Sequence, residues 1–239
     1  MLLQFLPCFW ALAHLVSATN HSSNKCHHVV HHYTRHDDIH EFLDVKPSYN
    51  PNRYPKPGHG PLLVNFSINV RSIFSLDEKE EILSLEASLR MYWKESRVQV
   101  LLPEDYPKNY ITLHPKMAER FWIPDMFIDR AKAVRIPSYY TRPASLRIYN
   151  DSLIRYSSRI NFDVACNMEF RMFPVDKQIC EVNFESFGYS SDEIQFQWRK
   201  DLSNINPNIT LTQFNFSVQF QDAYVTDYYD LKYPCSYPT

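Results

Sequence analysis

Two groups of residues in this sequence have types and spacings that could do chemistry, and the first is a pair of cysteines. Cys166 and Cys180 enclose 13 residues, with a Phe-Pro-Val-Asp turn sequence at 173–176 between them. A disulfide here would close a short loop and stabilise the fold by about 3 kcal/mol. A zinc site is the alternative for paired cysteines, but no histidine lies nearby and the spacing suits no tetrahedral pair.

The second group is a histidine tract near the N-terminus. His28, His32, His36 and His40 follow one another at i, i+4 spacing. On a helix this spacing stacks imidazoles along one face, which would suit Zn²⁺ or Cu²⁺ and makes His28, His32 and His36 candidate ligands. The alternative is a solvated polar helix face, and it is the interpretation we favour, so no metal is assigned.

Composition excludes several classes of function. The net charge is −2, and no basic stripe is present that would release counterions from nucleic acid. Only 3 glycines occur, against 16 Tyr and 16 Phe, and no P-loop or dinucleotide fingerprint appears, so we expect no cofactor. No nucleophile and base stand in a recognisable arrangement, so we expect a protein that is not an enzyme.

The N-terminal residues indicate the secretory pathway. Residues 1–18 are apolar and end in small residues, as a signal peptide does, and their removal would leave four cysteines, the other two being Cys26 and Cys235. After residue 18 no stretch is apolar enough to cross a bilayer. Five glycosylation sequons agree with a secreted or cell-surface protein: Asn20, Asn65, Asn150, Asn208 and Asn215.

The elements that must position these groups are mostly strands. Residues 19–61 comprise a His-rich segment, helical to about Asp44, and a loop with five prolines. Period-2 alternation of apolar residues then predicts an all-β, immunoglobulin-like sandwich of about ten strands behind that N-terminal α-helix. The predicted strands are Leu63–Phe74, Glu81–Tyr92, Arg120–Ile128, Leu146–Ile148, Leu153–Phe162, Ile179–Phe184, Glu193–Trp198 and Phe214–Tyr224.

Several motifs resemble those of one receptor family. The Cys166–Cys180 segment resembles the signature loop of the Cys-loop receptors, the pentameric ligand-gated ion channels. Trp122-Ile-Pro-Asp125 and the segment 92–98 (YWKESRV) are similar to two further family elements, 146–159 matches the hairpin before the signature loop, and 185–198 (ESFGYSSDEIQFQW) resembles the anion-channel branch, whose members include glycine-, glutamate- and GABA-type receptors. The resemblance covers about residues 62–239 and implies an extracellular ligand-binding domain in a homopentameric or heteropentameric ring, with the final strand and the membrane helices outside this sequence.

The resemblance also implies a small amine or amino-acid agonist bound between neighbouring subunits. On the principal face it implicates Glu185, Ser186, Phe187, Tyr228, Tyr233 and Tyr237. On the complementary face it implicates Ser88, Arg90, Arg147, Arg155, Ser157 and Arg159. Phe187 and Tyr233 could flank an ammonium group, and Arg90 could bind a carboxylate through two hydrogen bonds. Simple packing or surface ion pairs are the alternatives for these residues, and Trp93, Trp122 and Trp198 are expected in the core.

Some positions depart from the family pattern and leave alternatives open. Asp129 and Arg130 stand where many relatives carry other residues, which weakens the first principal loop as a ligand contact. Cys235 is either free or paired with Cys26. An alternative function is a soluble secreted ligand-binding protein, akin to the acetylcholine-binding proteins, without a channel; a structural subunit that binds no ligand is another.

Overall fold

The computed structural model describes residues 40–137, 140–173, 176–211, 214–221, 223–228 and 231–236, the last two ranges by their backbone only. The chain divides into two units, Met1–Asp37 and Asp38–Thr239, and every described residue belongs to the second. Most of the predicted N-terminal helix lies outside the described residues. Its predicted end near Asp44 is wrong, because residues 41–42 form a turn and Leu43–Val45 pairs with another strand.

Nearly all regular structure in the described residues is β-strand, with two short 3₁₀ helices, η1 (Pro115–Arg120) and η2 (Lys200–Leu202). The strands are β1 (Leu43–Val45), β2 (Leu62–Asp77), β3 (Ile82–Lys94), β4 (Val98–Val100), β5 (Tyr110–Leu113), β6 (Met126–Ile128), β7 (Ala131–Arg135), β8 (Ala144–Tyr149), β9 (Leu153–Ala165), β10 (Phe184–Ser186), β11 (Ile194–Trp198), β12 (Asn204–Ile205), β13 (Ala223–Tyr228) and β14 (Leu231–Ser236). No described helix is long and apolar enough to span a membrane.

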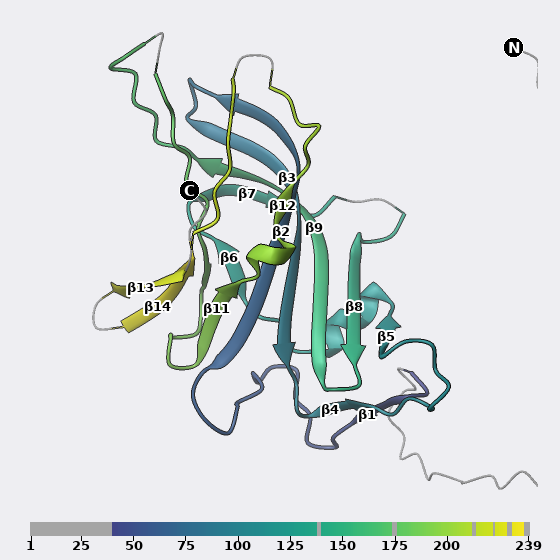
Figure 1. Cartoon of the computed structure of the whole chain (residues 1–239). Coiled ribbons are helices and arrows are strands. Elements are labelled where there is room, and N and C mark those ends of the chain that lie inside the picture. Colours follow the sequence, from purple (N-terminus) through teal and green to yellow (C-terminus); the bar gives the residue numbers. More distant parts are fainter. Residues whose placement is uncertain are drawn as a thin grey trace, which may run out of the picture. The chain divides into compact units, whose positions relative to one another are not determined.

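These strands form one large and two smaller sheets. In the large sheet the order is β11-β2-β3-β9-β8-β5, with β12 beside β2 and β7 beside β9. Its long antiparallel strands β2, β3, β9 and β8 run side by side in Figure 1. A second sheet has the order β13-β14-β10-β6, and β1 pairs with β4.

The two larger sheets pack face to face through aromatic side chains. Phe184 of the second sheet lies 5.8 Å, between ring centroids, from both Phe66 and Trp198 of the large sheet. Trp93 and Trp122 meet edge to face at 5.9 Å. All three tryptophans are buried, which confirms their prediction as core residues. The all-β sandwich is therefore confirmed, and its faces are fixed by the alternation of apolar residues.

Three predicted strands are shifted. Only Met126–Ile128 of the stretch 120–128 is a strand, because Pro124 has no N–H and the Trp122 N–H donates to the Tyr49 hydroxyl instead. Within 179–184 pairing begins only at Phe184, where Ile128 and Ser236 lie opposite. Residues 214–221 pair with no strand in the described part of the chain, and β13 begins at Ala223. β2 also continues beyond its predicted end at Phe74, as far as Asp77.

The disulfide between Cys166 and Cys180 is present, which confirms the expected pairing. Cys166 follows the end of β9 and is buried, and its N–H donates to the Glu81 carbonyl at the start of β3. The bond therefore ties the loop to the end of the large sheet. Several apolar side chains inside the loop are exposed, among them Phe170, Met172, Phe173 and Ile179.

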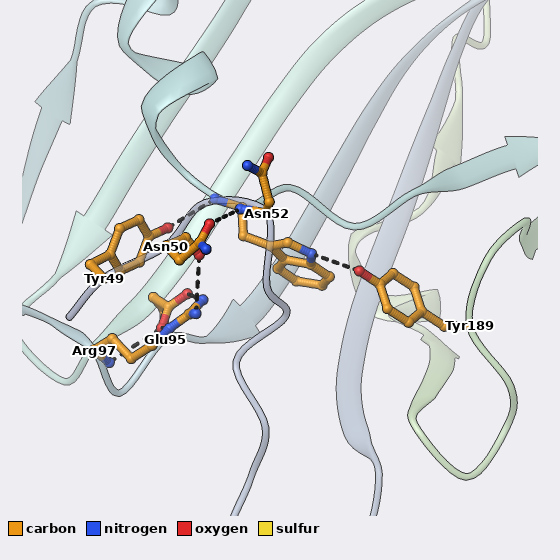
Figure 2. A network of polar contacts seen from close by, with 7 residues as sticks. Tyr49, Asn50, Asn52, Glu95, Arg97 and Tyr189 are labelled. Atoms are coloured by element: carbon orange, nitrogen blue, oxygen red, sulfur yellow. Dashed lines mark hydrogen bonds and ion pairs between the residues drawn. The ribbon is translucent and has the colours of Figure 1, made fainter.

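A buried ion pair joins the proline-rich segment to the sandwich (Figure 2). The Arg97 Nε donates to Glu95 Oε1 at 2.7 Å, and Nη2 donates to Oε2 at 2.6 Å. The Glu95 side chain has no exposed area, and that of Arg97 is 19% exposed. Arg97 Nη1 also donates to the Asn50 carbonyl, and the guanidinium lies 4.7 Å from the centre of the Tyr49 ring. Burial raises the pKa of Tyr49 to about 12.

We expect Arg97→Ala to destabilise the fold by about 3–5 kcal/mol, because it leaves the Glu95 carboxylate buried without its partner. Lys94→Ala is the matched control. Its ion pair with Asp151 is more than half exposed, so its loss should cost less than about 1 kcal/mol. Urea unfolding of both variants measures the difference, and equal costs would contradict a structural role for the buried pair.

Replacing both cysteines, Cys166→Ala with Cys180→Ala, should lower the free energy of unfolding by about 3 kcal/mol, because the unfolded chain regains the entropy of the open loop. Urea unfolding under oxidising conditions measures this loss. The wild-type chain under reducing conditions serves as the control and should match the double variant. A change below about 1 kcal/mol would show that the loop is held by its other contacts.

Candidate functional site

Three of the six predicted principal-face residues lie at or directly after the end of β10. Glu185 is half-buried and Ser186 is buried, whereas the Phe187 ring is 79% exposed. β10 pairs with β6 on one side and β14 on the other. Phe187 therefore follows the last paired residue of a central strand, which presents its aromatic ring to solvent from a rigid support.

Asp125 anchors this loop. The Ser186 hydroxyl donates to Asp125 Oδ1 at 2.7 Å, and the Gly188 N–H donates to Oδ2 at 2.6 Å. A Cβ atom at position 188 would approach the same carboxylate to 3.2 Å, so glycine suits the close contact. Ser186 also accepts from the N–H of Tyr189 at 3.0 Å. Because the hydrogen bonds enclose Phe187 on both sides, they fix the direction in which its ring leaves the sheet.

Phe127 of β6 is a further candidate site residue, which the sequence did not reveal. Its ring meets Phe187 edge to face, with centroids 5.7 Å apart. The available signal was its position two residues after Asp125, in the middle of a short strand. Sequence reasoning considered Asp129 and Arg130 instead. Arg130 has positive φ (53°) and lies 3.6 Å from Asp129 and 3.7 Å from Glu181, so these groups pair with one another.

The three predicted tyrosines belong to the β13–β14 hairpin or follow it. Tyr233 of β14 lies opposite Thr226, and Tyr228 of β13 lies opposite Leu231. Cys235 lies opposite Glu185 of β10, so the backbone of the hairpin borders the Phe187 loop. Tyr237 lies outside the described residues. Cys26, the candidate partner of Cys235, also lies outside them.

The six predicted complementary-face residues share one face of the large sheet. Half-buried positions alternate there with core positions such as Ala87 and Met91. Cross-strand register brings the six together, with pairs Ser88 opposite Arg159, Arg90 opposite Ser157 and Arg147 opposite Arg155. The sequence motifs predicted that these six residues belong to the complementary face. The strand register places them in adjacent rows on β3, β8 and β9.

Two of the arginines on this face have partners. Arg159 Nε lies 3.3 Å from Glu86 Oε1. The Arg147 guanidinium lies 4.7 Å from the centre of the Tyr110 ring, a cation–π contact. Arg90 makes no side-chain hydrogen bond or ion pair with any described residue.

Buried polar atoms without hydrogen bonds gather on the same face. Among the described residues they include Arg147 Nε, Arg155 Nε, Ser67 Oγ and Asn161 Oδ1. Such atoms normally find a partner, because an unmet buried donor costs about 1–3 kcal/mol. The Ser67 hydroxyl lies opposite Arg90, and the two arginine donors lie in the next row on β9 and β8, so this face suits an anionic or polar ligand.

The two faces lie on different sheets within one copy of the chain. The Phe187 loop belongs to the sheet of β6, β10 and β14, and the arginines belong to the large sheet. The arginine face points away from the buried core that separates the sheets. One copy therefore does not bring Phe187 and Arg90 together.

The remaining predicted sites are the histidine metal ligands and the glycosylation sequons. The candidate metal ligands His28, His32 and His36 lie outside the described residues, within which no cluster of metal-binding side chains occurs. Asn150, Asn208 and Asn215 are exposed. Asn65 is half-buried within β2, and the hydroxyl-bearing Ser67 of its sequon is fully buried.

Known proteins match this chain over most of its length. A family model described as the neurotransmitter-gated ion-channel ligand binding domain matches residues 38–238. The gamma-aminobutyric acid receptor subunit rho-1 of Mus musculus is 30% identical over 166 residues, and that of Homo sapiens is 30% identical over 163. Each alignment covers 66% of this chain and 33% of the relative, so the chain spans about a third of their length. The chain therefore belongs to the neurotransmitter-gated ion-channel ligand-binding domains, which are receptor domains and not enzymes.

Proposed function

We propose that this chain is the extracellular ligand-binding domain of a pentameric ligand-gated ion channel. It binds a small amine or amino acid between neighbouring subunits and transmits the resulting hairpin movement to a pore. The Phe187 loop and the β13–β14 hairpin form the principal face of the site. The outer face of β3, β8 and β9 on the next subunit forms the complementary face.

The separation of the two faces carries this proposal. An exposed aromatic ring on one sheet and unpaired arginines on another are unexplained in a single copy. When copies repeat around a ring, the principal face of one meets the complementary face of the next. Such a heterologous, head-to-tail interface produces a closed ring when the rotation from copy to copy adds up to a full turn. Each interface would then hold one complete site.

The chemistry of the two faces suits a ligand with an ammonium group and a carboxylate. Phe187 and Phe127 offer ring faces and edges on the principal side, and Glu185 supplies a negative charge. Cation–π contacts are worth about 0.5–2 kcal/mol, depending on how far water is excluded. On the other side, the planar guanidinium of Arg90 can donate two parallel hydrogen bonds to a carboxylate.

Two exposed loops at the end of the long strands support the coupling to a pore. The Cys166–Cys180 loop exposes Phe170, Met172 and Phe173, and the β2–β3 turn at 78–81 lies beside its base, where Cys166 bonds to Glu81. Exposed apolar side chains of this kind suit a contact with another domain. Ligand binding would shift the population between two arrangements of the ring, and these loops would transmit the shift.

The first test of the proposal is the mass of the chain in solution together with a ligand titration. A mass of five copies, and saturable binding of an amine or amino acid, are the expected results. A monomer that binds none of the amino-acid, amine and choline-type ligands would contradict the proposal. Glycans on Asn150, Asn208 and Asn215 would support an extracellular location, since all three are exposed.

Arg90→Ala should weaken the binding of a carboxylate ligand about 10- to 100-fold, because it removes a charge-assisted pair of hydrogen bonds. Isothermal titration calorimetry with an amino-acid ligand measures the change. Arg135→Ala is the matched control, since Arg135 of β7 already pairs with Asp163 at 2.5 Å. Unchanged affinity in Arg90→Ala would remove Arg90 from the site.

Phe187→Ala should weaken the binding of an amine-bearing ligand about tenfold while leaving the free energy of unfolding within about 0.5 kcal/mol, because the ring is exposed and contributes little to the core. Calorimetry and urea unfolding measure the two quantities separately. Phe74→Ala, at another exposed phenylalanine, should change neither. A large loss of stability in Phe187→Ala would show that the ring is a packing residue.

A further inference from the structure

We infer that the interior of the sandwich holds a binding site for a small uncharged molecule that is apolar over most of its surface. The site is a cavity of about 860 Å³ between the two larger sheets, at the end where the Cys166–Cys180 loop lies. It forms within one copy of the chain, and none of the residues assigned to the agonist lines it. The inference therefore does not depend on the proposed function.

The wall that the strands contribute consists of apolar residues. Ile68 and Val70 of β2, Leu85 of β3, Phe162 of β9 and Phe184 of β10 line the cavity and are buried. A charged group that entered this region would lose its hydration without gaining a partner. Dry apolar cavities instead take up apolar molecules, and sites for small molecules commonly enclose about 300–1,000 Å³. The size and the lining therefore suit an uncharged, apolar ligand.

Two walls of the cavity are held in place. The pairing of β2 with β3 shifts register after Val70 and again after Ile73. Such bulges bend a strand and increase its twist, so the sheet curves along the cavity. On another side, Cys180 lines the cavity and is bound through the disulfide to the end of β9. The bend and the covalent link keep these two walls from closing on each other.

The third wall is the segment 214–220, which pairs with no strand in the described part of the chain. Its apolar and polar residues alternate, as they do in a strand with one apolar side. Phe220 packs against Trp198 of the core, with ring centroids 5.6 Å apart. Phe216 and Val218 also line the cavity, but they remain 38% and 36% exposed. An apolar ligand would cover these two side chains, and the unpaired segment is the side from which it would enter.

The charged residues among the described lining lie at the edge of the cavity. Glu78 follows the end of β2 and Lys177 belongs to the disulfide loop, and both are exposed. Asp176 is half-buried and accepts a hydrogen bond from the Gln178 side chain. Two carboxylates and one ammonium leave an excess of one negative charge at the entrance. This excess disfavours an anionic ligand and leaves an uncharged one unaffected.

A matched pair of fluorescent probes tests the site. N-phenylnaphthylamine is uncharged, and anilinonaphthalene sulfonate has the same ring system with one sulfonate added. Titrated into the whole chain, the uncharged probe should bind saturably, with one molecule per chain. It should bind at least tenfold more tightly than the anionic probe.

Two variants locate the probe. Ile73→Trp fills part of the cavity, and Phe216→Asp places a carboxylate in its lining, so each should weaken binding of the uncharged probe at least tenfold. Phe74→Trp and Gln221→Asp are the matched controls, because both residues are exposed and neither lines the cavity. The controls should change the affinity less than twofold. Near-UV circular dichroism checks that each variant is folded, and Phe216→Asp decides if Ile73→Trp is not.

Three results would overturn the inference. The first is the absence of saturable binding, and the second is binding that persists in the folded cavity variants. The third is loss of binding in Met172→Ser, because Met172 is 73% exposed in the disulfide loop and lies outside the cavity. Equal affinities for the two probes would overturn the choice of an uncharged ligand. None of these results bears on the agonist site, which the amino-acid titrations test separately.

Discussion

The ion pair between Glu95 and Arg97 is the contact on which the principal side of the molecule depends. A carboxylate with no exposed area is tolerated only because the guanidinium binds both of its oxygens. The same arginine holds the Asn50 carbonyl and covers Tyr49, whose hydroxyl accepts the Trp122 N–H. The Trp122 indole N–H in turn donates to the Tyr189 hydroxyl at 3.3 Å, which extends the network to the loop that carries Phe187. The buried ion pair therefore holds the segment around Tyr49 and Asn50 against the sandwich, although this segment is not part of any strand.

The two candidate faces use that rigidity in different ways. On the principal side, Asp125 replaces missing strand pairing with two short hydrogen bonds around an exposed ring. On the complementary side, the register of β3, β8 and β9 holds like charges in adjacent rows, although a fold selected for stability alone would avoid them. Violations of local packing and charge rules are expected at functional sites. The scaffold tolerates the arginine cluster because the opposite face of the same strands is a continuous apolar core.

The residues missed at the site show what a linear pattern does not contain. Trp122-Ile-Pro-Asp125 was recognisable as a motif, but the role of Asp125 depends on Ser186 and Gly188, about sixty positions away in the chain. In the sequence, nothing distinguishes Phe127 from an ordinary strand residue. The pairing of β6 with β10 places it against Phe187. Short strands such as β1 and β4 carry little periodic signal, and they exist because each supplies the other's hydrogen bonds. Because β1 and β4 form only when the tertiary structure brings them together, the sequence pattern did not reveal β1, and the predicted helix extended too far, to about Asp44.

The sequence by itself determined the fold class, the disulfide loop and the receptor family, because alternation, cysteine spacing and motif residues are local properties. It also named the arginines and the aromatic residue at position 187. Only the tertiary structure decided which charges are neutralised, since Glu86 and Asp163 reach Arg159 and Arg135 but leave Arg90, Arg147 and Arg155 without a carboxylate among the described residues. It also decided that the two halves of the site lie on different sheets. Both facts depend on strand register, which is fixed by long-range pairing and the shared burial of one face rather than by any single segment.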